Sequence, residues 1–207
     1  LFDMYLNALF LAKERCRVWY GHSGVFFPET MDFWGTYANT NYGWEWERQE
    51  LPAGVTVNRY IRYLWSGGLE LVNLMLDAYD FYEDERFLQE KLLPLAVEVL
   101  EFYDRHFPRQ DGKLRLYPSQ SLETYQDASG PLPELAGLQV VLDRLLGLPA
   151  QAYDASRRET WQRLRLEVPG LPVLERQDGL VLAAAEEIYE EAKNCENPEL
   201  YAIFPFR

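Results

Sequence analysis

The stretch Gly67-Gly-Leu-Glu-Leu-Val-Asn-Leu-Met-Leu-Asp-Ala-Tyr-Asp-Phe-Tyr82 is the strongest indication of fold in the sequence. From Leu69 onward it is apolar on most sides, so the predicted helix is buried on most of its surface rather than along one stripe. The helical pattern begins near residue 56 and is interrupted by Gly67-Gly68. A helix covered on most sides is typical of the inner layer of a helical barrel.

Further helices are predicted on both sides of this stretch. Their ranges are 1–19, about 84–106 with a kink at Pro94, 133–147 and about 154–167, and the last is a more polar, outer helix capped by Asp154. Residues 113–117 predict a short strand, and Asp178-Gly179 predicts a hairpin turn. Residues 186–193 fit either a loop or a helix, and Asn197-Pro198 predicts a helix start. We therefore expect an all-α fold with minor β, built from antiparallel helix pairs as part of an (α/α)6 barrel.

The length and net charge of the chain limit the classes of protein to which it can belong. The 207 residues predict a single domain over 1–207, and the net charge of −13 disfavours nucleic acid and anionic membranes as partners. Cys16 and Cys195 are predicted to be buried thiols, with a single bridge as the alternative, and with two histidines a zinc site is not expected. We expect a soluble protein, secreted or periplasmic in a bacterium if exported, with no cofactor.

Both ends of the chain predict an incomplete barrel. Leu1 opens directly into a helical pattern, and Arg207 follows soon after the helix start at Asn197. We expect the remainder of the barrel, either from its own chain or from another chain, to be a partner. The isolated chain is accordingly expected to be inactive.

A long segment rich in aromatic residues, from 20 to 54, predicts a functional loop. Trp34, Trp44 and Trp46 alternate there with polar residues such as Glu29 and Arg48. Aromatic rings pack on the C–H faces of sugars, and the polar groups bind the hydroxyls, so a carbohydrate cleft is one interpretation. The other is that the rings only anchor the loop to the domain.

Candidate catalytic carboxyls are harder to select, because the chain has 33 acidic residues. Glycoside hydrolysis needs a protonated carboxylic acid and a second carboxylate. Glu123 lies in a loop with Tyr117 and Tyr125 nearby, which suits a desolvated acid. Glu134 is either a site residue or a first-turn acid of a helix, and Glu186 is either a base or part of a solvated face. His22 is either a substrate donor or a loop histidine bonded to backbone.

Several segments together resemble a known family. They are Tyr20-Gly-His-Ser-Gly-Val-Phe-Phe-Pro-Glu-Thr30, Gly67-Gly-Leu-Glu-Leu71, Tyr117-Pro-Ser-Gln-Ser-Leu-Glu-Thr-Tyr125, Pro133-Glu-Leu-Ala-Gly137 and Glu196-Asn-Pro-Glu-Leu-Tyr-Ala-Ile-Phe-Pro-Phe-Arg207. The chain resembles an uncharacterised bacterial group related to glycoside hydrolase family 95, the inverting α-L-fucosidase-type six-hairpin glycosidases. The likeness to the bacterial group spans the chain, whereas the link to the fucosidases is more remote.

The resemblance implies roles for particular residues. The fucosidases carry the general acid in a Pro-Ser-x-Ser-Pro-Glu-Asn segment. Residues Pro118–Thr124 resemble this segment, with Leu122 and Thr124 in place of its Pro and Asn. The resemblance implies that Glu123 is the acid. The fucosidases' His-Arg-His-x-Ser-His-Leu segment, which follows the base, is replaced at 196–200, so fucose specificity does not carry over. Among the acids before it we favour Glu186 as the base. Substrate contacts are expected from His22, Glu29, Trp34, Trp44, Arg48, Glu134 and Asn197.

The function expected from these observations is inverting hydrolysis of an α-glycosidic bond in an oligosaccharide or glycoside. One alternative is a non-catalytic carbohydrate-binding or scaffold domain, which would keep the aromatic loop but need no Glu123 in a cleft. Another is a polysaccharide lyase. Lyases bind anionic substrates with basic residues, so the charge of −13 disfavours that alternative.

Overall fold

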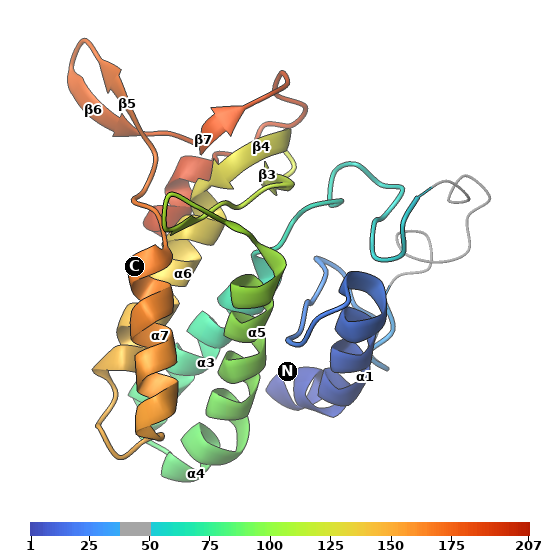
Figure 1. Ribbon diagram of the computed structural model, residues 1–207, viewed down its shortest axis with the longest axis vertical. Coiled ribbons are helices and arrows are strands. Elements are labelled where there is room, and N and C mark those ends of the chain that lie inside the picture. Colours follow the sequence, from blue (N-terminus) through green and yellow to red (C-terminus); the bar gives the residue numbers. More distant parts are fainter. Residues whose placement is uncertain (38–50) are drawn as a thin grey trace.

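The computed structural model describes residues 1–37 and 51–207 (Figure 1). A layer of helices forms the body of the molecule, a small sheet covers one end of this layer, and the N-terminal helix lies along one side of it. The apolar core is shared by these helices and by the C-terminal segment that ends in Phe206 and Arg207.

Helix α3 (Gly67–Tyr82) lies at the centre of the core. It buries Leu69, Val72 and Met75, and it packs between α5 (Leu93–His106) and α6 (Leu132–Gly147). The close approach of α3 to α5 depends on Gly68, because a Cβ there would lie 3.1 Å from Val99 Cγ1. The prediction of a helix after Gly67-Gly68 is confirmed, but the expected burial on most sides is wrong, because Leu74, Asp77 and residues 80–82 are exposed. The residues just before it, 56–66, form turns rather than helix.

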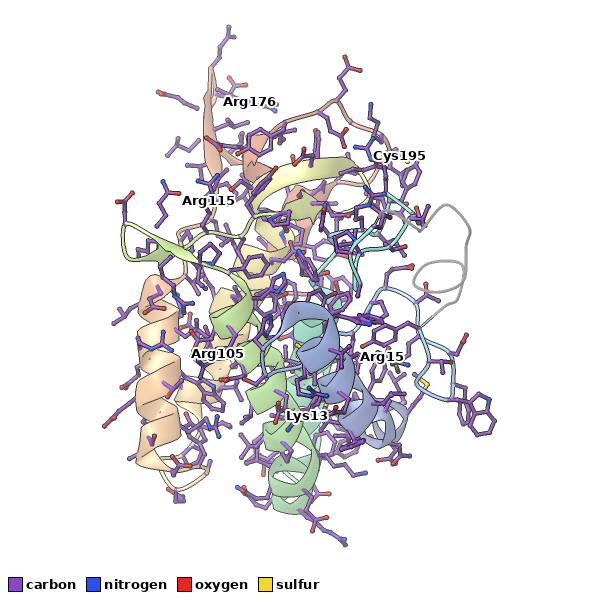
Figure 2. The ribbon with its side chains drawn as sticks, turned by 45° about the vertical axis from the view of Figure 1, so that its right-hand side comes forward. Lys13, Arg15, Arg105, Arg115, Arg176 and Cys195 are labelled. Atoms are coloured by element: carbon purple, nitrogen blue, oxygen red, sulfur yellow. The ribbon has the colours of Figure 1, made fainter. Side chains whose placement is uncertain are left out.

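Helix α1 (Phe2–Tyr20) packs on α5 and buries the small residues Ala8, Ala12 and Cys16. Lys13 Nζ donates to Glu98 Oε1 of α5 at 2.5 Å. Arg15 donates to the carbonyl of Gly35 at 2.7 Å (Figure 2 shows both side chains). These contacts attach α1, and the loop that follows it, to the helical layer.

The predicted helix over 84–106 is three consecutive pieces. Asp84 caps α4 (Glu85–Phe87) by accepting from the N–H groups of Arg86 and Phe87, and a π-helical turn, η2 (Leu88–Leu92), leads into α5. Proline has no N–H for the bond to the residue four positions back. Pro94 is the second residue of α5, directly after η2, so the change from π-helical to α-helical bonding falls at the proline.

Helix α6 begins with Leu132 and Pro133, and α7 (Ala155–Glu167) packs on it. The predicted cap of α7 is confirmed, since Asp154 Oδ1 accepts from Arg157 N at 2.8 Å. α6 buries a continuous apolar face, whereas α7 buries only Trp161 and Leu164. This agrees with the predicted polar outer helix.

Short strands form three small antiparallel sheets in the described part of the chain. β1 (Arg109–Gln110) pairs with β2 (Lys113–Leu114), and β5 (Val173–Arg176) pairs with β6 (Gly179–Leu182), as the turn at Asp178-Gly179 predicted. The third sheet has the order β3-β4-β7 and comprises β3 (Ser119–Ser121), β4 (Tyr125–Pro131) and β7 (Ala185–Ile188). The chain ends in a 3-10 turn, η3 (Pro198–Ala202), and a coil.

The predicted all-α fold, part of an (α/α)6 barrel, is wrong. The described residues form a mixed α/β fold, in which β4 pairs with β7 through Ala128 with Ile188 and Pro131 with Ala185. The segment from 186, which fitted a loop or a helix, is thus partly a strand. β4 is poor in β-branched residues, and its partner β7 is far away in the sequence. No local sequence pattern therefore predicted the pairing.

Among the described residues, every helix is too short or too polar to cross a membrane.

Candidate active site

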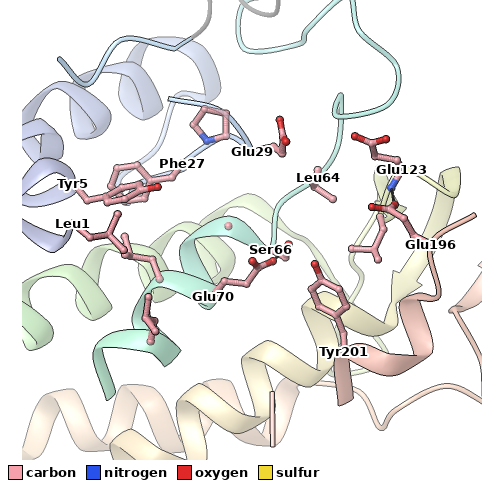
Figure 3. A pocket seen from close by; sticks show the side chains of 15 residues that line it. Leu1, Tyr5, Phe27, Glu29, Leu64, Ser66, Glu70, Glu123, Glu196 and Tyr201 are labelled. Carbon is pink, nitrogen blue, oxygen red and sulfur yellow. Dashed lines mark hydrogen bonds between the residues drawn. The ribbon is translucent and has the colours of Figure 1, made fainter. Parts of the chain in front are cut away.

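A pocket of about 360 Å³ opens between the N-terminal helix, the start of α3, the β3–β4 turn and η3 (Figure 3). Four glutamates contribute to its lining: Glu29, Glu70, Glu123 and Glu196. They come from four separate segments, so only the tertiary structure brings them together. The other lining residues are Leu1, Tyr5, Phe27, Pro28, Leu64, Ser66, Gly67, Leu71, Leu74, Leu122 and Tyr201.

Glu70 lies in the first turn of α3, where a carboxylate interacts favourably with the helix dipole. The hydroxyl of Ser66, the residue that precedes α3, donates to Glu70 Oε1 at 2.7 Å. Burial raises the pKa of Glu70, and the Ser66 hydrogen bond opposes that rise only in part. The carboxyl points toward the pocket in Figure 3. Glu70 is therefore a desolvated carboxyl with access to a ligand.

Glu123 lies at the rim, in the turn between β3 and β4. The turn requires Leu122 in the left-handed region, with φ 51°. The backbone N–H of Glu123 donates to Glu196 Oε2 at 2.8 Å, and Asn194 Nδ2 donates to Glu123 Oε2 at 2.7 Å. The half-buried Glu123 carboxyl is thus held by the chain that follows β7.

An apolar wall and a phenol complete the pocket. The rings of Tyr5 and Phe27 meet edge to face, with centroids 5.1 Å apart. Tyr201 of η3 stands between Glu70 and Glu196 in Figure 3. Burial, followed by the charge of Glu70, raises the pKa of the Tyr201 phenol, so it stays a neutral hydrogen-bonding group. A ligand would therefore meet ring faces on one side and carboxyls with a hydroxyl on the other.

The charged side chains described in the lining of the pocket are all acidic. No Lys, Arg or His is among the described residues that line it. An anionic ligand would be repelled, whereas a neutral polyhydroxylated ligand would find several hydrogen-bond acceptors. Chemically, two carboxyls on different walls of one pocket can donate a proton at one end of a bond and accept a proton at the other.

The residues predicted from the sequence fall in several places. Glu123 and Glu29 line the pocket described above. Glu186, our predicted base, is exposed on β7 and lines a different pocket of about 600 Å³ with Lys113, Arg115 and Glu187. The structure therefore does not bring Glu186 together with Glu123.

The predicted substrate-binding residues are also dispersed. Trp34 is 83% exposed and lines a separate pocket with Met4 and Asn7 of α1. Asn197 precedes η3 and makes no side-chain cap, and although it directly follows Glu196 it does not line the pocket. Trp44 and Arg48 lie outside the described residues.

His22 and Glu134 both have partners within the protein. His22 Nε2 lies 3.0 Å from His106 Nδ1, in a contact between the loop after α1 and the end of α5. Glu134 is fully buried and accepts from the backbone N–H of Trp65 at 3.2 Å. Burial raises the pKa of Glu134 to about 8. Neither residue lines the pocket.

Sequence reasoning missed Glu70, Asn194, Glu196 and Tyr201 as site residues. Glu70 and Glu196 fall in two of the segments that carry the family resemblance, which was the available signal. Nothing in the local pattern around Asn194 distinguished it from other polar loop residues. Its role depends on a contact with a turn some seventy residues earlier.

No grouping of three or more His, Cys, Asp or Glu side chains suited to a metal ion occurs within residues 1–37 and 51–207. No protein-family model matches the chain, and no curated protein matches it.

Proposed function

We propose that this protein hydrolyses glycosidic bonds in the pocket lined by Glu70 and Glu123. The single observation that supports this proposal is the presence of these two carboxyls, from α3 and from the β3–β4 turn, on different walls of one pocket. Glycoside hydrolysis needs two such groups, one as acid and one as base or nucleophile. The neutral apolar wall of Tyr5 and Phe27 suits the C–H face of a sugar ring.

In the proposed mechanism Glu123 is the general acid, as the resemblance of its segment implies. Its carboxyl would give a proton to the glycosidic oxygen as the bond to the anomeric carbon breaks. The leaving group then departs as a neutral alcohol, so no negative charge develops on it. The position of Glu123 at the rim of the pocket allows the aglycone to extend into solvent.

Glu70 is the second carboxyl in this proposal and replaces Glu186. It would take a proton from a water molecule as that water attacks the anomeric carbon on the face opposite the leaving group. Burial, which raises the pKa of Glu70, makes its ionised form a stronger base. Attack by water on the opposite face inverts the anomeric configuration.

The proposal is tested with the full-length protein on a panel of α-glycosides that have unactivated and nitrophenyl leaving groups. Glu123→Gln is expected to lower kcat/KM on unactivated substrates by about 10²–10⁴-fold, with a much smaller loss on nitrophenyl glycosides, which need little protonation. Glu70→Gln is expected to lower activity on both. NMR of the first-formed sugar should show the inverted anomer.

Glu186→Gln is the matched control, because it makes the same change in the other pocket. We expect it to leave kcat/KM within about twofold of the wild type, as is usual for a surface change away from a site. Loss of activity in Glu186→Gln with retention in Glu70→Gln would restore Glu186 as the base. Sugar binding with no turnover of any substrate would favour the non-catalytic alternative.

A further inference from the structure

The chain that follows β7 is bonded closely to the turn that carries Glu123. Lys193 N donates to the carbonyl of Thr124 at 2.7 Å, and Thr124 Oγ1 donates to the carbonyl of Glu196 at 3.0 Å. With the bonds from Glu123 N to Glu196 and from Asn194 to the Glu123 carboxyl, four hydrogen bonds join residues 193–196 to residues 123–124. A hairpin turn at a surface is ordinarily a mobile part of a protein, so these bonds fix one that would otherwise move.

The orientation of the Asn194 amide follows from its own partners. Its Oδ1 accepts from the backbone N–H of Cys195 at 2.8 Å. A backbone N–H can only donate, so the oxygen of the amide must face Cys195 and the NH₂ group must face Glu123. The contact to Glu123 Oε2 at 2.7 Å is therefore an N–H donation to the carboxyl, in the range of a charge-assisted bond.

We propose that Asn194 is a positioning residue that selects which oxygen of Glu123 performs proton transfer. A protonated carboxyl has one carbonyl oxygen, which accepts, and one hydroxyl, which donates. Because Oε2 already accepts from Asn194, the transferable proton belongs on Oε1. This inference rests on the proposed function, because Glu123 transfers a proton only as the general acid, whereas the Asn194 contact is present whatever the pocket binds.

Glu196 holds the main chain of Glu123, as Asn194 holds its side chain. Its Oε2 accepts from Glu123 N, and Figure 3 shows the two residues adjacent at the rim. The side chain and the main chain of Glu123 are thus held by two residues of one short segment, two positions apart. The other titratable side chains that line the pocket are Tyr5, Glu29, Glu70 and Tyr201, and the hydrogen bonds of the Asn194 side chain go to Glu123 and Cys195 instead.

The kinetic test is Asn194→Ala in the full-length protein. Without the Asn194 N–H, neither oxygen of the Glu123 carboxyl is held, so either oxygen can carry the proton. The kcat should fall about tenfold with KM nearly unchanged, because substrate binding does not depend on which oxygen carries the proton. Asn197→Ala is the matched control, because that asparagine makes no side-chain cap and does not line the pocket.

A second measurement does not depend on activity. In ¹H–¹⁵N spectra, the side-chain NH₂ signal of Asn194 should move between the wild type and Glu123→Gln, because the carboxyl that accepts its hydrogen bond is replaced by an amide. An Asn194 signal that is unchanged in Glu123→Gln, or a kcat of folded Asn194→Ala equal to that of the wild type, would overturn the positioning role. An inactive wild type in which the Asn194 signal still responds to Glu123→Gln would contradict the proposed function, and with it the proton transfer, while the contact itself stands.

Discussion

Glu134, in the first turn of α6, accepts a hydrogen bond at 3.2 Å from the backbone N–H of Trp65, two residues before α3 begins. One fully buried carboxyl thus joins the N-terminal ends of two core helices that are far apart in the sequence. Its other oxygen, Oε2, is buried without a hydrogen-bond partner among the described residues. The arrangement has a pH dependence that can be measured.

The free energy of unfolding is expected to fall as pH rises toward 8 because of Glu134. Its pKa is about 8 in the folded protein, against an ordinary value of 4.5, so the folded state binds the extra proton between these two pH values. The stabilisation is complete below pH 4.5 and is lost as pH rises through 8, with about 5 kcal/mol as an upper bound. Urea unfolding at pH 6.5 and pH 8.5 measures the loss. Glu134→Gln should remove most of this loss. If the free energy of unfolding of that variant still fell as much between the two pH values, the assignment to Glu134 would be contradicted.

His106 has the opposite pH dependence. Burial, followed by the charge of His22, lowers the pKa of His106 to about 4, so the unfolded chain binds the proton first as pH falls below 6.5. The stabilisation present above pH 6.5 should be lost between pH 6.5 and pH 4, by about 3 kcal/mol. His106→Phe would retain the ring contact with Phe102, whose centroid is 4.6 Å away, without a titrating group. Thermal melts at pH 7 and pH 4.5 should differ less in that variant than in the wild type.

When both rings are neutral, the histidine pair has a defined proton arrangement. His22 Nδ1 lies 2.7 Å from the carbonyl of Ser23, which can only accept, so Nδ1 carries the hydrogen. His22 Nε2 is then an acceptor, and His106 Nδ1 donates to it. A proton added to His22 Nε2 would replace this donor–acceptor contact with a donor–donor one, which adds to the cost of burying a charged His106.

Gly24→Ala is expected to destabilise the packing of the loop after α1 on α5. Gly24 has φ +103°, and an added Cβ would lie 2.4 Å from the backbone N of Phe102. Backbone atoms cannot move aside as the end of a flexible side chain can, so the free energy of unfolding should fall by about 3 kcal/mol or more. Gly21→Ala is the control: Gly21 also has a positive φ, but nothing lies within 4 Å, and about 1 kcal/mol is expected. Equal losses in the two variants by urea unfolding would show that the contact with α5 is unimportant.

The C-terminal coil is expected to contribute strongly to stability through Phe206. This ring is buried against Gly137 of α6, where a Cβ would lie 2.8 Å from Phe206 Cζ, and Asn73 Nδ2 donates to the carbonyl of Pro205 at 2.9 Å. Phe206→Ala should cost about 3–5 kcal/mol. Phe204→Ala, at a ring that is 72% exposed, should change stability by less than about 0.5 kcal/mol. Calorimetry of both variants would contradict this role if the two melting temperatures agreed.

Much of the candidate site could not be predicted from the sequence. The resemblance of residues 117–125 to an acid-bearing segment selected Glu123, and the structure places it on a pocket. The second carboxyl was sought among the acids that follow β6, whereas the pocket offers Glu70 of α3. The reason is that β7 pairs with β4 in a register that directs Glu186 to the other pocket, and register is a non-local property.

Local sequence was sufficient to predict most helices and turns, because their signals repeat within a few residues. The helix over residues 69–82, the cap at Asp154 and the turn at Asp178-Gly179 all formed as expected. The β3-β4-β7 sheet, the placement of Glu70 and Glu123 on one pocket, and the contact of Asn194 with Glu123 arise only in the folded chain. These contacts join segments far apart in the sequence, and their stability comes from burial and hydrogen bonding across the fold rather than from any local preference.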